Sequence, residues 1–148
     1  MTWLLDTNVV SEGVRQRPDA RVMRWISTRP RQELSICLIT LAELRSGALA
    51  APDAELKADI TQWIENDVIS FFDERIIALS VDILIDWIGL SQRLRSAGTA
   101  KDAADLLIAA TARFHNLTLV TRNVRDFAGT GTVVYDPWRD RTHRMDKP

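Results

Sequence analysis

The sequence is poor in the residues that build disulfide bonds and zinc sites. Its 148 residues include one cysteine, Cys37, and two histidines. A single cysteine excludes an internal disulfide bond and a cysteine-based zinc site. It also fits a reducing compartment, where disulfide bonds are rare. The sequence has no cluster of histidines and cysteines that would indicate a zinc site.

A leader segment and long apolar runs are also missing. The N-terminus, MTWLLDTN, has no basic region and reaches an acidic residue at position 6, so we expect no secretory signal peptide. No stretch approaches the ~18 uncharged apolar residues of a membrane span. The most apolar long segment, Ile76 to Leu90, carries Asp82 and Asp86. We therefore expect a cytoplasmic protein without a membrane-spanning helix.

Lysine is scarce, and the positive charge comes almost entirely from arginine. The formal net charge is -1 and the pI is near 6.1, which argues against a uniformly basic surface. Arginine suits bidentate phosphate contacts, although a GC-rich coding sequence would give the same bias. The densest basic segment is either a phosphate-binding surface or a solvated helix face. It contains Arg15, Arg17, Arg21, Arg24, Arg29 and Arg31.

Apolar runs that favour strands alternate along the chain with segments of helical periodicity. The length suits one domain. The expected strands are residues 2–5, 34–39, 76–79, 117–120 and 132–135, and the main expected helices are residues 19–26, 40–49, 54–69, 81–94 and 102–114. This alternation is typical of an α/β fold, with a parallel sheet and right-handed crossovers. We expect the domain to cover residues 1–138, followed by a polar basic tail over residues 139–148.

Acidic residues gather where the expected strands end. Asp6 ends the first strand, Glu43 lies in the first turn of the helix after the second, and Asp105 lies in the first turn of the helix before the fourth. Asn123 and Asp126 follow the fourth strand. In open α/β sheets the functional cleft lies beyond the carboxyl ends of the strands. The sequence therefore predicts that carboxylates from distant segments meet at one edge.

Each acid also has a purely structural interpretation. Asp6 fits a turn, Glu43 would complete a capping box that begins at Thr40, and Asp105 would favour the positive end of a helix capped by Asp102. The neighbouring sequence weighs against these interpretations, because Glu43 and Asp105 lie within apolar stretches. Grouped buried carboxylates repel one another, and their pKa values rise unless a cation lies among them.

Two kinds of cation would satisfy such a group. Arg45 and Arg122 lie near the acids in the sequence and are candidates for a structural ion-pair network with them. The alternative is a hard divalent ion held by oxygen ligands, as Mg²⁺ and Mn²⁺ commonly are.

Four motifs in this order resemble those of the PIN-domain ribonucleases. They are LLDTNVVSE, TLAELRSG, ADLLIAATA and TRNVRDF followed by DPW. The chain is most similar to VapC-type toxins of type II toxin–antitoxin pairs, in the FitB-like branch, from Met1 to about Trp138. The resemblance implies a PIN-like three-layer α/β/α sandwich with a four- or five-stranded parallel sheet. It also implies Mg²⁺ or Mn²⁺ in an acidic pocket, endonuclease activity on RNA, a homodimer and an antitoxin that neutralises the toxin.

The resemblance carries over to individual residues. Asp6, Glu43 and Asp105 match the three core acids of the family, so they are the expected catalytic and metal-binding residues. The chain departs from the pattern at Asn123, where some relatives have aspartate, and Asp126 is placed to compensate. The auxiliary candidates are Thr7 and Thr121, as hydroxyl donors to water or phosphate, and Arg45 and Arg122, as contacts to RNA phosphate.

Two other functions fit parts of the same pattern. A strand that ends in aspartate also opens haloacid-dehalogenase-like phosphatases, in which the residue equivalent to Asp6 is a nucleophile. That class needs a second aspartate two residues later, where this chain has Asn8. A non-catalytic binding module would use the acids only to engage a basic partner.

Overall fold

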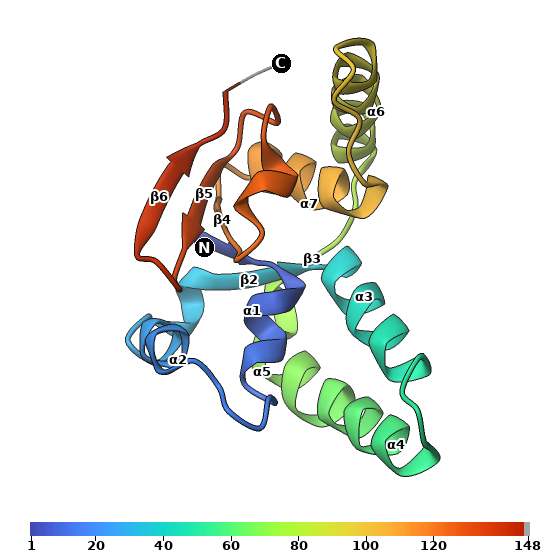
Figure 1. Ribbon diagram of the computed structural model, residues 1–148, viewed down its shortest axis with the longest axis vertical. Helices are drawn as coiled ribbons and strands as arrows, with labels where there is room; N and C mark the ends of the chain where they lie inside the picture. The colour runs from blue at the N-terminus through green and yellow to red at the C-terminus, as the bar shows by residue number, and fades with distance from the viewer. Residues whose placement is uncertain (147–148) are drawn as a thin grey trace.

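A computed structural model describes residues 1–146 as a mixed α/β domain (Figure 1). The strands are β1 (Trp3–Leu5), β2 (Leu34–Cys37), β3 (Ile76–Ile77), β4 (Thr118–Val120), β5 (Val133–Asp136) and β6 (Arg141–Arg144). The helices are α1 (Thr7–Glu12), α2 (Ala20–Ser27), α3 (Leu38–Leu49), α4 (Ala54–Trp63), α5 (Ile69–Phe72), α6 (Val81–Ser96) and α7 (Ala103–Phe114). Short 3-10 or π turns occupy residues 31–33, 64–68, 73–75 and 124–127.

The six strands form one sheet in the order β3-β2-β1-β4-β5-β6. The first five run parallel, as the resemblance implies, and β6 pairs antiparallel to β5. At the centre, β1 pairs with β4 so that Leu5 lies opposite Val120. The residues that follow these two strands are therefore neighbours at the carboxyl edge of the sheet.

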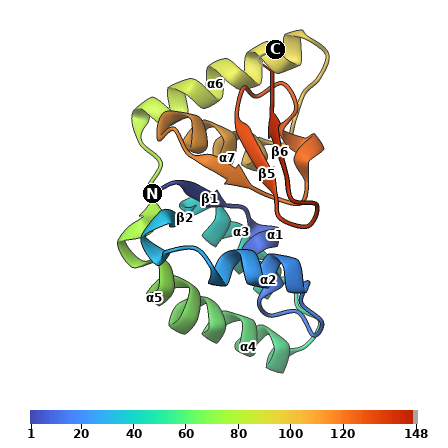
Figure 2. The same ribbon diagram turned by 90° about the vertical axis from the view of Figure 1, so that its left-hand side faces the viewer.

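Helices cover both faces of the sheet, which gives the expected three layers (Figure 2). Side chains of a strand alternate between the two faces, so Leu4 packs into a core with α6 and α7, whereas Leu5 packs into a core with α1 to α5. The same alternation places Leu119 in the first core and Val120 in the second. With both faces covered, the parallel strands are mostly apolar.

Side-chain caps explain where most of the helices begin. Asp19, Asp53, Ser80 and Asp102 each accept a hydrogen bond from a backbone N–H in the first turn of α2, α4, α6 and α7. Such caps satisfy N–H groups that have no partner within the helix. The cap at Asp102 was expected from the sequence, and it fixes the start of the helix that carries Asp105.

The structure differs from the expected elements at three places. The segment 139–148 was expected to be a tail, but Arg141–Arg144 form β6 because their backbone completes a hairpin with β5; residues 147–148 lie outside the described part. The helix expected over residues 54–69 is present as α4, a π turn at Ile64–Val68 and α5, and it runs on to Phe72. The short helix α1 was not predicted. Within residues 1–146, no helix has the length and apolarity needed to span a membrane.

Candidate active site

Asp6 lies at the carboxyl edge of the sheet and is buried, with 5% of its surface exposed. It is the N-cap of α1, and its Oδ1 accepts a hydrogen bond of 2.8 Å from the backbone N–H of Thr7. Its Oδ2 accepts from the hydroxyl of Thr121 at 2.7 Å and from the side-chain amide of Asn8 at 3.0 Å. Burial raises the pKa of Asp6, while these three hydrogen bonds oppose that rise. The carboxylate is thus held in one orientation by neutral donors.

Glu43 is brought beside Asp6 through Thr7. The hydroxyl of Thr7 donates a hydrogen bond of 2.8 Å to Oε1 of Glu43, which connects α1 to α3. Burial raises the pKa of Glu43, with a further contribution from the charge on Asp6. The alternative interpretation of Glu43, a capping box that begins at Thr40, is wrong, because α3 begins at Leu38. Glu43 therefore lies in the second turn of α3, and its side chain accepts from Thr7 instead.

Asp105 lies in the first turn of α7 and is only partly buried. The apolar residues that follow it on the same helix face, Ile108, Ala109 and Ala112, are fully buried. Burial raises the pKa of Asp105 to about 7, helped by the negative charges of Asp6, Asp126, Asp102 and Glu43. This list of neighbours shows that acids from four separate segments lie close enough to interact.

Asn123 and Asp126 lie at the rim of this group rather than inside it. Both are exposed, in and just before the 3-10 turn Val124–Phe127. The charge of Asp126 nevertheless contributes to the raised pKa values of Asp6 and Asp105. The second hydroxyl predicted from the sequence, that of Thr121, is fully buried and contacts Asp6 directly.

The two candidate arginines do not neutralise the acids. Arg45 pairs with Glu65 at 3.2 Å, and the guanidinium of Arg122 lies over the ring of Trp138 at 5.5 Å from its centroid. Among the ion pairs formed within residues 1–146, none includes Asp6, Glu43 or Asp105. The ion-pair network considered as an alternative from the sequence is therefore absent from this part of the chain.

The side-chain chemistry suits a hard divalent ion. Asp6, Glu43 and Asp105 supply carboxylate oxygens, and none of these acids has an ion-pair partner among residues 1–146. No three acidic, histidine or cysteine side chains within the described range are grouped so that they would hold an ion together. Mg²⁺ usually binds one or two carboxylates directly and keeps several waters, so it does not need such a group. The residues present fit a hydrated Mg²⁺ or Mn²⁺ ion.

The contacts of Asn8 make it a candidate functional residue, although the sequence analysis did not predict it as one. Its side-chain amide donates to both Asp6 and Thr121 at 3.0 Å, and its carbonyl oxygen accepts from the backbone N–H of Arg122 at 3.0 Å. It thereby ties the ends of β1 and β4 together. The signal that would have found it is its place two residues after a strand-ending aspartate, on a helix that was not predicted.

Comparison with known protein families places most of the chain within one family model. Residues 3–131 match the model described as PIN domain. Three similar relatives span almost the whole chain. Plasmid stability protein StbB of Pseudomonas syringae pv. tomato is 33% identical over 91% of this chain and 97% of its own. Toxin FitB of Neisseria gonorrhoeae is 32% identical over 93% and 99%. VapC ribonuclease Y4jK of Sinorhizobium fredii is 31% identical over 91% and 96%.

Solved structures give the same result for the fold. The crystal structure of FitAcB from Neisseria gonorrhoeae contains a chain that matches with a TM-score of 0.86 at 31% identity, covering 93% of this chain and 99% of that one. A toxin–antitoxin complex from Klebsiella pneumoniae contains another, with a TM-score of 0.65 at 29% identity and coverage of 92% and 98%.

Proposed function

Because this chain belongs to the PIN-domain family, we propose that it is an endoribonuclease that hydrolyses RNA phosphodiester bonds with Mg²⁺ or Mn²⁺, and that it is the toxin of a toxin–antitoxin pair. A relative named as a VapC ribonuclease, 31% identical over nearly the full length, supports the activity. A relative named as a toxin and a structural neighbour described as a toxin–antitoxin complex support the biological role.

One observation carries the proposal. Asp105 lies near four other carboxylates, and no arginine or lysine of the described residues pairs with it. Burial and these neighbouring charges raise its pKa to about 7. A fold gains no stability from such an arrangement, because like charges in a partly buried group repel. Perturbed carboxylates gathered in one place are typical of functional sites, and a divalent cation would satisfy them.

Asp6 and Asp105 would hold the metal directly or through water, with Glu43 completing its shell. When bound, the metal would polarise a phosphoryl oxygen and lower the pKa of a water. The chain's own contribution is orientation. The donors Thr7, Asn8 and Thr121 fix Asp6, so its free lone pairs point in one direction before substrate arrives. Supporting hydrogen bonds of this kind tune carboxylate ligands.

Glu43 is suited to orient or deprotonate the attacking water. One of its oxygens accepts from Thr7, which leaves the other without a hydrogen bond from the described residues. Its raised pKa brings its proton affinity nearer to that of a useful general base. Asn123 and Asp126 stay auxiliary in this proposal: Asn123 carries no charge, and Asp126 strengthens the negative field at the rim. Thr7 and Thr121 act through the carboxylates they contact.

The proposed partners are RNA, an antitoxin and a second copy of the chain. Arg45 and Arg122 are the proposed contacts to RNA phosphate. The dimer would form through α6, where Val81, Ile85 and Ile88 are 73%, 63% and 49% exposed on one helix face. Contiguous exposed apolar residues mark interaction surfaces.

The test is cleavage of a labelled single-stranded RNA by the purified chain. We expect cleavage with Mg²⁺ or Mn²⁺, its loss with chelator, and its return when metal is restored. Asp6→Asn should lose cleavage, and Asp59→Asn, an exposed carboxylate on α4, serves as the matched control. RNA binding without cleavage under any metal condition would favour a binding module. Hydrolysis of a small phosphomonoester instead of RNA would favour the phosphatase alternative.

A further inference from the structure

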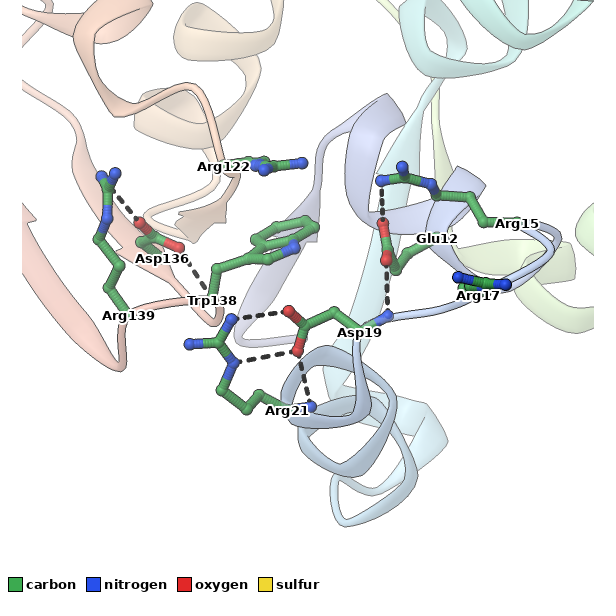
Figure 3. Close-up of a pocket in the computed structure, with 9 residues that line it drawn as sticks. All are labelled: Glu12, Arg15, Arg17, Asp19, Arg21, Arg122, Asp136, Trp138 and Arg139. Carbon is green, nitrogen blue, oxygen red and sulfur yellow. Dashed lines mark hydrogen bonds and ion pairs between the residues drawn. The ribbon is translucent and has the colours of Figure 1, made fainter.

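A hollow lined by arginines lies between α1, α2 and the turn that joins β5 to β6 (Figure 3). Its volume is about 430 Å³. The charged residues that line it are Arg15, Arg17, Arg21, Arg122, Arg139, Glu12, Asp19 and Asp136. Five positive and three negative side chains leave a formal charge of +2, in a protein whose net charge is -1. We name this feature the arginine pocket.

The arginines of this pocket come from separate parts of the chain. Arg15 and Arg17 lie in the loop after α1, Arg21 lies on α2, Arg122 follows β4, and Arg139 follows β5. Their convergence answers a question that the sequence left open. Three members of the basic segment do not lie dispersed on a solvated helix face, but share one hollow with arginines more than 100 residues away in sequence.

The acids of the pocket are already committed to the fold. Glu12 is 3% exposed; it accepts from the backbone N–H of Asp19 at 2.7 Å and pairs with Arg15 at 3.4 Å. Asp136 is 1% exposed; it accepts from the backbone N–H of Trp138 at 2.9 Å and pairs with Arg139 at 3.8 Å.

The remaining carboxylate, that of Asp19, pairs with Arg21 at 2.7 Å. Arg17 and Arg122 therefore have no ion-pair partner among residues 1–146. Arg122 packs against Trp138, which keeps its planar group at the pocket. An unpaired guanidinium presents a fork of N–H donors that matches the oxygens of phosphate.

Hydrogen bonds and helix α1 connect the arginine pocket to the acid group. The backbone N–H of Arg122 donates to the side chain of Asn8, and the preceding residue, Thr121, donates to Asp6. Helix α1 starts just after Asp6 and ends at Glu12 in the pocket wall, a length of ~9 Å at 1.5 Å per residue. A strand of a few nucleotides could therefore span from the acid group to the arginine pocket.

This arrangement solves an electrostatic problem of the proposed function. A cluster of carboxylates repels a polyanion, so RNA needs positive charge beside the cleavage site. We propose that the arginine pocket is a phosphate-binding subsite that holds single-stranded RNA one or a few nucleotides from the bond to be cut, with Arg17 and Arg122 as its principal contacts. This proposal rests on the ribonuclease function proposed above.

The test measures binding separately from cleavage. In an Asp6→Asn background, which blocks the reaction, the affinity for a fluorescein-labelled ten-nucleotide RNA is followed by anisotropy over a range of salt concentrations. The test variant is Arg17→Gln/Arg122→Gln. The charge-matched control is Arg93→Gln/Arg95→Gln, on α6 at the other face of the sheet. All four arginines are exposed, and thermal melts verify folding.

We expect the pocket variant to bind at least ~10-fold more weakly at low salt, and its slope of log K against log salt to fall by ~1.4, or ~0.7 for each lost phosphate contact. The control should change far less. In the Asp6 background, Arg17→Glu alone provides a second variant that leaves the contact between Arg122 and Trp138 intact, and it should weaken binding as well.

Separate outcomes overturn the two proposals. If the chain with native Asp6 cleaves RNA while the pocket variant binds and cleaves as the control does, the subsite is wrong and the ribonuclease function stands. If the chain neither cleaves nor binds RNA with Mg²⁺ or Mn²⁺, the proposed function fails and the subsite fails with it. Tighter binding of duplex DNA than of single-stranded RNA, lost in the pocket variant, would also overturn the subsite by assigning the pocket to DNA.

Discussion

The hydroxyl of Thr121 donates a hydrogen bond of 2.7 Å to the carboxylate of Asp6, across 115 residues of sequence. The contact follows from the register of the two central strands, since β1 ends opposite the end of β4. Both side chains are buried. A buried carboxylate without charged partners depends on such neutral donors for its orientation.

Replacing Thr121 with valine should therefore lower both stability and activity. Removing the donor leaves a buried carboxylate less well satisfied, and we expect a loss of about 1–3 kcal/mol in the free energy of unfolding. RNA cleavage should fall by about 10–100-fold, as for other residues that orient a metal ligand. Denaturant unfolding and single-turnover cleavage measure the two effects. Thr118→Val, at the start of β4 and away from Asp6, is the control, and an equal effect of both changes would contradict this role.

The contact between Thr7 and Glu43 gives a sharper substitution pair. Thr7→Ser keeps the hydroxyl that donates to Glu43, whereas Thr7→Val keeps the shape and loses the donor. We expect the serine variant to cleave RNA at close to the unmodified rate and the valine variant to be about 10–100-fold slower. Circular dichroism verifies that both variants are folded. Equal cleavage rates of the two variants would show that the hydroxyl of residue 7 does not contribute to activity.

The acid group should make the metal-free protein sensitive to pH. In the folded protein the pKa of Asp105 is about 7, against 3.8 ordinarily, so folding favours its protonated form. The resulting stabilisation is complete below about pH 4 and is lost as the pH rises through 7. The pKa values of Asp6 and Glu43 are also raised, so they act in the same direction.

We therefore expect Asp105→Asn to melt at a higher temperature than the unmodified chain in chelator at pH 8, by about a few degrees. The difference should shrink toward pH 4, and added Mg²⁺ should reduce it at pH 8. Scanning calorimetry across this range gives the measurement, with Asp59→Asn on α4 as the control. A difference that is independent of pH would exclude charge repulsion as its cause.

The exposed apolar face of α6 predicts a dimer that two substitutions disrupt. Ile85→Glu/Ile88→Glu places charges on side chains that are 63% and 49% exposed, so the monomer should still fold. We expect light scattering after gel filtration to give a dimer mass for the unmodified chain and a monomer mass for the variant. Gln62→Glu, exposed on α4 at the other face of the sheet, should remain dimeric. A monomer mass for the unmodified chain would refute this use of α6.

The sequence was sufficient to predict the main parallel strands and their carboxyl-edge acids. The apolar runs before Asp6 and up to Val120 favour strands, and each is followed directly by polar residues. Few other structures fit that pattern. It was insufficient for α1 and β6, because tertiary context decides both. Helix α1 has six residues and depends on its cap at Asp6, and β6 is a polar edge strand whose pairing with β5 provides its order.

The same limit applies to the site. Asp6, Glu43 and Asp105 stand out because carboxylates in apolar segments are unusual, and the structure brings them into electrostatic contact. Asn8 and the arginine pocket were not predictable as a set, because an amide or an exposed arginine has many ordinary surface roles. Only the fold shows that Arg17 and Arg122 share a hollow.

Titration calorimetry of Mn²⁺ into the purified chain tests the metal site most directly. We expect saturable binding by the unmodified protein, no measurable binding by Asp6→Asn or Asp105→Asn, and unchanged binding by the Asp59→Asn control. If the unmodified chain and both variants take up Mn²⁺ with equal affinity, or none of them binds it, then the gathered carboxylates are not a site for a divalent ion.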